Sequence, residues 1–235
     1  RVADKANDAK TQFLATMSHE IRTPLYGALG TLELLARTDL NPRQKEYVGA
    51  IQSSSSTLLQ LICDVLDVSK IEAGQLALEV SEFAPLDLIQ EVVNGYSAAA
   101  QSKGLQLYAH IDPQLPEQLI GDAPRIRQIL NNLLSNAVKF TESGQIVVRV
   151  TVESRSDERV MVLWQVTDTG LGIAQEDQPF LFDPFYQTGS RANVITGTGL
   201  GLSICQRLMY LMSGSMCVVS EPGLGSSFTL GLPLE

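Results

Sequence analysis

The chain has 235 residues, of which 44% are hydrophobic and 18% are charged, so it can form one large or two small globular domains and is not disordered. Its formal net charge of −9 argues against a surface for nucleic acid or anionic lipid, which needs clustered Lys and Arg. No apolar run approaches the roughly 20 residues that span a membrane, and no signal peptide is visible. The cysteines are odd in number and lack metal-ligand spacing, which predicts reduced core residues in a cytosolic compartment: Cys63, Cys205 and Cys217.

Residues 1–12 are polar with a few small apolar side chains, and they predict a helix that runs into the next segment. This helix is either the end of a coiled coil arriving from an upstream sensor or a frayed end. Because the chain opens on Arg1 rather than Met, we expect a fragment of a longer protein.

Residues 13–35 predict a long amphipathic helix in a bundle, because apolar side chains recur at steps of three and four. His19 lies about 200° round the helix from its apolar neighbours, so we expect an exposed imidazole beside Glu20. Pro24 cannot donate to the carbonyl of Glu20, so the helix should bend or loosen there. The residues expected in the buried seam are Leu14, Met17, Ile21, Leu25, Ala28, Leu32 and Leu35.

A second helix is predicted after a short loop, with Asn41 as N-cap, Pro42 in the first turn and Gly74 as a C-cap. Two long helices with a short connection form a hairpin. Alone, this hairpin would expose an apolar stripe, which two copies would bury as a four-helix bundle. We therefore predict a homodimer through residues 1–72. The apolar face expected on the second helix contains Val48, Ile51, Leu58, Ile62 and Val65.

The remainder predicts a mixed α/β domain, because its strands and helices are grouped, as in a sheet with helices on one face. The expected organisation is a dimerisation and phosphotransfer domain at 1–73, a linker at 74–82 and a catalytic domain at 83–235. The expected helices cover 85–102, 124–139 and 200–212, and the expected strands cover 105–111, 145–153, 160–167, 215–220 and 226–231.

Three polar side chains of the helix at 125–139 share one face, because Asn132, Asn136 and Lys139 are spaced by four and three. Asparagine is a poor helix former, so its recurrence there is informative. An amide oxygen can complete a Mg²⁺ shell beside phosphates, and a lysine can pair with phosphate oxygens. The alternative is a solvated, asparagine-rich surface.

Two glycine-rich stretches follow. Residues 166–173 form a strand that ends in Asp-x-Gly-x-Gly, where Asp168 can accept a hydrogen bond from an exocyclic amine. In isolation this could be an ordinary strand-to-loop turn. Residues 197–202 open a helix, and amides at a helix N-terminus favour phosphate, although a lone GxGxG is weak evidence.

The sequence Ser18-His19-Glu20-Ile21-Arg22-Thr23-Pro24 resembles the phosphoacceptor box of sensor histidine kinases. The other boxes of that family follow in its order. Residues 125–139 resemble the N box, 166–173 the G1 box, 181–186 the F box, 197–202 the G2 box and 223–228 a small terminal box that closes the pocket.

The resemblance covers residues 10–233 and implies the kinase core of a hybrid sensor kinase in a two-component system. The implied fold is a two-helix hairpin, forming a dimeric four-helix bundle, followed by the α/β sandwich that such kinases share with gyrase, a heat-shock chaperone and mismatch-repair ATPases. ATP and Mg²⁺ are the implied cofactors. The implied location is the cytoplasmic part of a bacterial sensor anchored in the inner membrane.

The resemblance also implies roles for single residues. His19 is the implied phosphoacceptor, Glu20 accepts or orients its other ring N–H, and Thr23 supports dephosphorylation of the partner. Asn136 is the implied Mg²⁺ ligand and Asp168 the residue that reads the adenine amino group. Residues 187–196 would form the ATP lid. The implied ATP-binding residues are Asn132, Asn136, Lys139, Asp168, Gly170, Gly172, Phe182, Phe185, Arg191, Gly197, Thr198, Gly199, Leu200 and Gly201.

The implied partner is a receiver domain of a response regulator, in cis or in trans, whose aspartate takes the phosphoryl group. An ATPase of the gyrase type is disfavoured, since those enzymes place a water-activating Glu where this chain has Asn132. A degenerate kinase that serves as a regulatory module stays open, because the lid departs from the usual pattern and has Arg191 as its only cation. His110 is expected to be a packed or edge residue, and Trp164 to lie in the sheet core.

Overall fold

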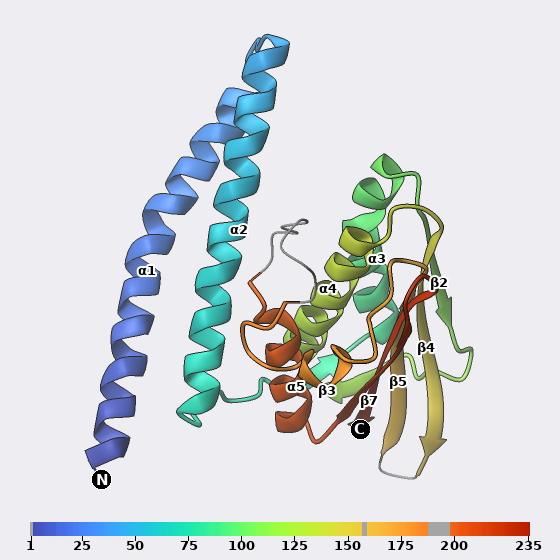
Figure 1. The fold of residues 1–235 in the computed structure, drawn as a ribbon. Coiled ribbons are helices and arrows are strands. Elements are labelled where there is room, and N and C mark those ends of the chain that lie inside the picture. Colours follow the sequence, from blue (N-terminus) through green and yellow to red (C-terminus); the bar gives the residue numbers. More distant parts are fainter. Residues whose placement is uncertain (1, 157–158, 188–197) are drawn as a thin grey trace. The chain divides into compact units, whose positions relative to one another are not determined.

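The computed structural model describes residues 2–156, 159–187 and 198–235, and for residues 2–15 it describes only the backbone. The chain divides into two compact units, Arg1–Leu76 and Ala77–Glu235 (Figure 1). The first unit is helical, and the second combines a sheet with helices.

The first unit is a hairpin of two helices, α1 at Val2–Ala36 and α2 at Pro42–Glu72, which lie side by side (Figure 1). The α1 helix continues through Pro24, so the expected loosening does not interrupt it. At the start of α2, Asn41 caps the helix as predicted. Its Oδ1 accepts from the Gln44 N–H at 2.9 Å, while Gln44 Oε1 accepts from the Asn41 N–H at 2.9 Å. At the other end the C-cap is Ala73, one residue before the predicted Gly74.

Of the predicted α1 seam, only Leu25 and Leu32 are half-buried within the hairpin, and Leu14 is among the residues whose side chains the structure does not describe. Residues spaced by four and three, from buried Ser18 through half-buried Arg22, Leu25, Leu29 and Leu32, form the more buried side. Seam residues that stay exposed include Met17 at 37%, Ile21 at 38% and Leu35 at 42%, and Ala28 is exposed as well. This exposure agrees with the expectation that the hairpin alone leaves an apolar stripe uncovered, because one neighbouring helix covers only one side of a broad apolar face.

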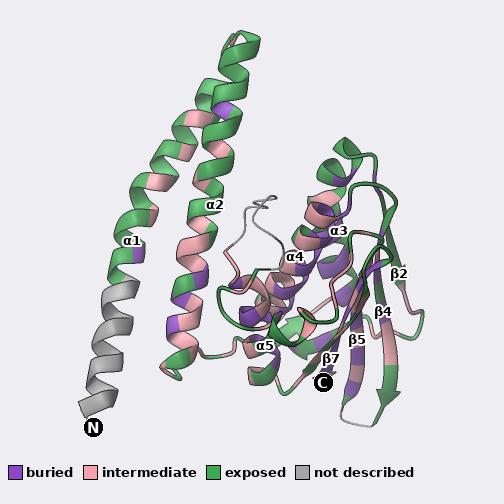
Figure 2. Cartoon of the chain, in the orientation of Figure 1, coloured by how far each residue is buried: buried purple, intermediate pink, exposed green. Residues whose placement is uncertain are grey.

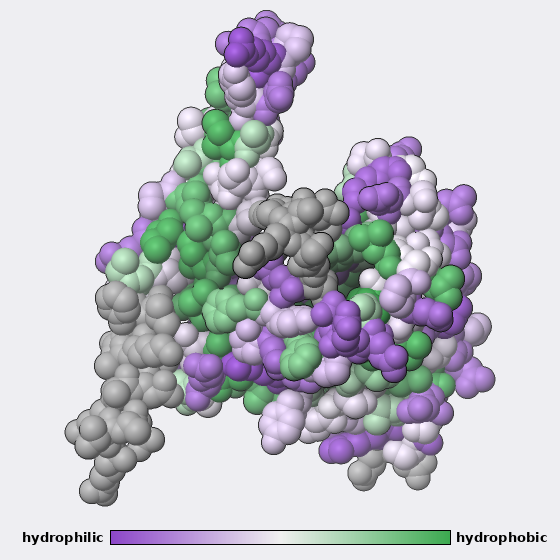
Figure 3. Space-filling model, in the orientation of Figure 1, coloured by the Kyte–Doolittle hydropathy of each residue, from purple (hydrophilic) through white to green (hydrophobic). Residues whose placement is uncertain are grey.

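The apolar face of α2 divides in the same way. Val48 is buried and Ile62 half-buried, whereas Ile51, Leu58 and Val65 are 50%, 45% and 38% exposed. Figure 3 shows apolar side chains gathered along the middle of the hairpin. Six of the exposed apolar residues recur every seven positions within their helix and are here called the hairpin stripe: Ile21, Ala28, Leu35, Ile51, Leu58 and Val65.

The second unit is built on a five-stranded sheet with the order β2-β4-β5-β7-β6, in which only β2 and β4 pair in parallel. Helices α3, α4 and α5 lie on one face of this sheet (Figure 1), as the grouped pattern predicted. The strands are β2 Gln106–Ile111, β4 Gln145–Arg155, β5 Val160–Asp168, β6 Ser215–Glu221 and β7 Gly225–Leu234, and the helices are α3 Pro85–Ser102, α4 Ala123–Phe140 and α5 Gly201–Leu211.

A small antiparallel pair, β1 at Ser81–Phe83 and β3 at Leu119–Gly121, was not predicted. Strands of three residues are too short to show a periodic pattern. A short 3₁₀ helix, η1 at Gln178–Phe180, also lies in this unit.

The core of the second unit lies between the sheet and the helices (Figure 2). Along β5 every second side chain is buried, from Val160 to Asp168, because alternate residues of a strand face the helices. Trp164 in the middle of β5 is fully buried, so its predicted place in the sheet core is confirmed. The buried face of α4 is formed by Ile126, Ile129, Leu130, Leu133, Leu134, Ala137 and Val138.

The remaining expectations concern cysteines and one histidine. None of the three cysteines is in a disulfide, but Cys217 is exposed and Cys63 half-buried, so only Cys205 is a buried core residue. Cys217 was misassigned because it lies on the outward side of the edge strand β6. His110 is exposed on β2, the opposite edge strand, which confirms the prediction of an edge residue.

Candidate functional site

His19 lies on the exposed side of α1, next to Glu20, which is also exposed. The Thr23 hydroxyl donates to the His19 carbonyl oxygen at 3.0 Å, so this side chain binds the backbone one turn away. Among the residues that the structure describes, no hydrogen bond joins the His19 ring to Glu20. The imidazole is therefore open to solvent in this unit.

The N-box asparagines lie together on α4. Asn136 Nδ2 donates to Asn132 Oδ1 at 3.3 Å, and both residues are half-buried. Lys139 is one turn further on, with its Nζ 4.9 Å from the centre of the Phe140 ring. Burial lowers the pKa of the Lys139 ammonium. These three side chains present an amide oxygen and a cation along one helix face, as their spacing predicted.

The G2 glycines lie where larger side chains would collide. A Cβ at Gly201, the first residue of α5, would overlap the Asn132 side chain, so the N-terminus of α5 directly meets the N-box face. A Cβ at Gly199 would come within 2.7 Å of Phe185 Cα. Between them, Leu200 is buried, and its N–H donates to Thr198 Oγ1 at 3.1 Å. The segment can therefore bring backbone amides close to a ligand.

Asp168 is the last residue of β5 and lies on the side of the sheet that faces the helices. It is only 8% exposed, and burial raises the pKa of its carboxyl group. The backbone N–H groups of Gly170 and Ser226 oppose this shift by hydrogen bonding to the carboxylate, the first at 2.8 Å from Oδ1. Asp168 is thus a buried acceptor in a fixed orientation.

The G1 loop that follows Asp168 rests on two other elements. A Cβ at Gly170 would lie 2.5 Å from the Phe140 carbonyl oxygen, which also accepts a hydrogen bond from the Leu171 N–H at 3.2 Å. A Cβ at Gly172 would overlap the Glu221 carbonyl in the β6–β7 turn. The loop is therefore held between the C-terminal end of α4 and this turn.

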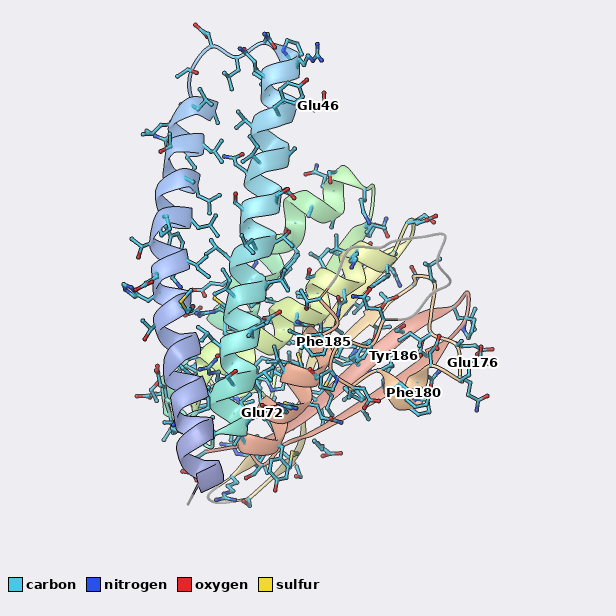
Figure 4. All side chains as sticks on the ribbon, turned by 60° about the vertical axis from the view of Figure 1, so that its left-hand side comes forward. Glu46, Glu72, Glu176, Phe180, Phe185 and Tyr186 are labelled. Atoms are coloured by element: carbon cyan, nitrogen blue, oxygen red, sulfur yellow. The ribbon has the colours of Figure 1, made fainter. Side chains whose placement is uncertain are left out.

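The F box turns sharply before the predicted lid. Phe182 is half-buried, but Phe185 is 71% exposed and has a φ of +67°, rare for a bulky residue. The Phe185 N–H donates to the Gly199 carbonyl at 2.8 Å, which joins the F box to the G2 segment. Tyr186 lies 5.5 Å from the Phe180 ring (Figure 4), and the hydrogen bond from its hydroxyl to Asp177 raises the pKa of the phenol.

The structure therefore brings together most of the predicted nucleotide-binding residues of the second unit, around the end of β5, the N-box face of α4 and the start of α5. The predicted acceptor residues His19, Glu20 and Thr23 belong to the other unit. Arg191, Gly197 and the lid residues 188–196 lie outside the described residues.

Two family models match this chain. Residues 9–74 match the His Kinase A (phospho-acceptor) domain, and residues 121–235 match the family of histidine kinase-, DNA gyrase B- and HSP90-like ATPases. The chain therefore combines a His Kinase A (phospho-acceptor) domain with an ATPase domain of the histidine kinase-, DNA gyrase B- and HSP90-like family.

Known histidine kinases resemble it along its whole length. The sensor histidine kinase RcsC of Salmonella typhimurium is 46% identical over 236 aligned positions, which cover 100% of this chain and 24% of that protein. The sensor protein GacS of Pseudomonas syringae is 45% identical over 98% of this chain and 26% of its own length. The chain thus spans about a quarter of these curated relatives.

A solved structure has the same fold. The crystal structure of full-length ShkA in complex with AMPPNP matches with a TM-score of 0.75 and 36% identity, over 95% of this chain and 46% of that chain. The sequence resemblance and the predicted fold, a hairpin followed by an α/β ATPase domain, are therefore confirmed.

The sequence pattern does not reveal contacts that are made through the backbone. The Ser226 amide on Asp168 and the Phe140 carbonyl under the G1 loop show no side-chain signal. The contact of the Lys103 ammonium with the Val138 and Lys139 carbonyls at the end of α4 is likewise invisible in the sequence, although the Gly104 that follows Lys103 is the usual mark of a helix end. Among the described residues, no helix is long and apolar enough to cross a membrane, and no three His, Cys, Asp or Glu side chains form a metal cluster.

Proposed function

We propose that this chain is an ATP-dependent protein-histidine kinase that phosphorylates itself on His19 and passes the phosphoryl group to a receiver aspartate in two-component signalling. The proposal rests on the close packing of Asn132, which accepts a hydrogen bond from Asn136 on α4, against Gly201 at the start of α5. This arrangement aligns an amide oxygen with backbone donors, as a triphosphate requires.

Asp168 is the proposed adenine-reading residue. Two backbone N–H groups already bind its carboxylate, and the carboxylate retains acceptor capacity for an exocyclic amine. Because the side chain is buried, a bound base would be recognised away from competing water. The close packing at Gly170 and Gly172 fixes the loop beside it.

Asn136 is the proposed Mg²⁺ ligand. Its amide nitrogen donates to Asn132, so its oxygen is the atom available to a hard cation. The site contains an amide and lacks a carboxylate cluster among the described residues, so phosphate oxygens would supply the other ligands. When bound, Mg²⁺ would neutralise phosphate charge. Lys139, the amides of residues 198–201 and Gly197 are proposed to bind the remaining phosphate oxygens.

His19 is the proposed nucleophile. Its exposed, neutral imidazole would attack the γ-phosphorus, forming the N–P bond as the bond to the ADP oxygen breaks. Glu20 would accept or orient the other ring N–H. Thr23 is proposed to support the reverse task, dephosphorylation of the partner, and its hydrogen bond to the His19 carbonyl positions it one turn away.

The partners follow from the hairpin stripe and from the relatives. We propose that two chains pair through residues 1–72 and bury the stripe in a four-helix bundle. A receiver domain, elsewhere in a longer chain or separate, would take the phosphoryl group. We further propose that the protein is the cytoplasmic portion of a membrane-anchored bacterial sensor.

Incubation with γ-labelled ATP and Mg²⁺ tests the proposal. The unaltered chain should take up label, and His19→Gln should take up none. His110→Gln is the matched control, because it removes the only other histidine, which is exposed on an edge strand away from the nucleotide site. Label retained in His19→Gln would refute His19 as the acceptor, and bound ATP without label would favour a regulatory module.

A further inference from the structure

The carbonyl groups at the C-terminal end of α4 accept hydrogen bonds from three different parts of the chain. The last four carbonyl groups of a helix lack partners within it. Here the Ala137 carbonyl accepts from the Thr141 N–H at 3.1 Å, and the Phe140 carbonyl accepts from the Leu171 N–H of the G1 loop at 3.2 Å. The two between them, on Val138 and Lys139, accept from a side chain on another helix.

That side chain is Lys103, the C-cap residue of α3. Its Nζ lies 2.6 Å from the Val138 carbonyl oxygen, 3.1 Å from that of Lys139 and 3.4 Å from that of Thr141. Three ammonium donors thus meet three carbonyl acceptors, and the positive charge stands at the negative end of the helix dipole.

The backbone under Lys103 is itself fixed. The Leu105 N–H donates to the Ala100 carbonyl and the Gly104 N–H to the Gln101 carbonyl, both at 2.9 Å, which is the Schellman arrangement. Gly104 has a φ of +70°, as this motif requires, and Leu105 is buried. The lysine therefore extends from a rigid helix end.

We propose that Lys103 is a positioning residue for adenine recognition, because it holds the helix end on which the Asp168 loop rests. The inference depends on the proposed function of Asp168. Lys103 binds the carbonyls on either side of Phe140, those of Lys139 and Thr141, and the Phe140 carbonyl accepts from Leu171 and packs against Gly170. Loss of the ammonium loosens this turn, and the Asp168 carboxylate loses its fixed orientation toward the amino group of adenine.

The test compares two nucleotides on the full chain: ATP, and purine riboside triphosphate, which lacks the 6-amino group. In Lys103→Met, ATP affinity should fall about threefold to tenfold, while the analogue, which makes no amino contact, should lose clearly less. The preference for ATP over the analogue therefore narrows. An equal loss for both nucleotides, or no loss for either, would overturn the inference.

Arg127→Met is the matched control. Arg127 also joins α4 to α3, through an ion pair with Glu91 at 2.8 Å, but it lies near the N-terminal end of α4. Arg127→Met should leave the preference for ATP over the analogue unchanged. A loss of this preference equal to that in Lys103→Met would overturn the inference.

Lys103→Gln keeps two N–H donors but loses the charge, and it provides a second test in case Lys103→Met does not fold. It should reduce the preference for ATP over the analogue by less than Lys103→Met does. An unchanged preference in folded Lys103→Gln would count against the inference. If the unaltered chain binds ATP and shows no preference for its amino group, the assignment of Asp168 fails and this inference with it. If that preference exists and Lys103 leaves it unaffected, the proposed function stands and only the inference fails.

Discussion

The two units of this chain differ in how completely each one buries its apolar side chains. In the second unit, Trp164, Leu134 and Leu230 are fully buried between sheet and helices. In the hairpin, by contrast, Ile51, Leu58 and Val65 remain between 38% and 50% exposed. The α/β unit therefore has a complete core within one chain, whereas the hairpin has half of one. This contrast supports the proposal that the unit with the proposed phosphoacceptor pairs with a second copy, whereas the unit with the proposed nucleotide site has its core within one chain.

A charge in the hairpin stripe should have the largest effect. Leu58→Asp would place a carboxylate in the proposed bundle core, and an uncompensated buried charge costs several kcal/mol. We expect a dimer in the unaltered chain and a monomer or unfolded hairpin in the variant, as measured by light scattering after size-exclusion chromatography. Ser56→Asp, exposed about 200° away on the same helix, should remain dimeric. A dimeric Leu58→Asp would contradict the role of the stripe.

A cavity in the core of the α/β unit should destabilise that unit and leave the hairpin unaffected. Leu134 is fully buried on α4, so Leu134→Ala should destabilise the second unit by about 2–5 kcal/mol. Denaturant unfolding followed by Trp164 fluorescence reports on this unit, since Trp164 is the only tryptophan. The chain should still be dimeric in buffer. Loss of the dimer at the same denaturant concentration as loss of the core would show that the two units are not independent.

Asp168→Asn should separate nucleotide binding from stability. Burial raises the pKa of Asp168, so its charged form is unfavourable in the folded chain, and a neutral amide should leave the stability without nucleotide unchanged or slightly higher. A hydrogen bond to a charged group contributes about 1.5–3 kcal/mol, so ATP affinity should fall by about tenfold to a hundredfold. Isothermal titration and thermal unfolding measure the two quantities. An Asp168→Asn variant that is less stable but binds ATP with unaltered affinity would show that Asp168 supports folding rather than nucleotide recognition.

The pH dependence of nucleotide binding should be a smaller effect of the same kind. Because the pKa of Asp168 is raised, its carboxylate becomes protonated at a higher pH than an ordinary aspartate, and ATP affinity should fall by up to about tenfold per pH unit below that point. The lowered pKa of Lys139 predicts a second decline on the alkaline side. The effect of the Asp168 carboxyl on stability has the opposite pH dependence. The free energy of unfolding should fall as pH rises from the ordinary pKa of an aspartate to the raised pKa of Asp168. If ATP affinity still falls at acid pH in Asp168→Asn, another titrating group causes the decline.

Local signals in the sequence predicted most of the fold. The period of α4, the alternation along β5 and the cap at Asn41 are encoded by neighbouring residues, and the structure contains all three. The seam of α1 was predicted as one buried stripe because periodicity shows that a face is apolar but does not show which element covers it. Met17 and Leu25 have the same signal and differ in exposure.

The nucleotide site was less accessible to sequence reasoning. The spacing of Asn132 and Asn136 was enough to place both on one helix face. Their contact with Gly201 joins positions that are far apart in the chain and depends on the absence of a side chain. The support that Lys103 gives to α4 similarly depends on backbone carbonyls, which have no signature in the sequence.

We propose above all that the exposed imidazole of the hairpin receives the phosphoryl group from the nucleotide bound by the α/β unit. Mapping of the modified residue tests this most directly, by digestion and tandem mass spectrometry of the chain after incubation with ATP and Mg²⁺, with acid and alkaline treatment in parallel. We predict one phosphoryl group on His19, lost in acid and stable in alkali. A phosphoryl group on another residue, or one that survives acid as a serine or threonine ester does, would contradict the account.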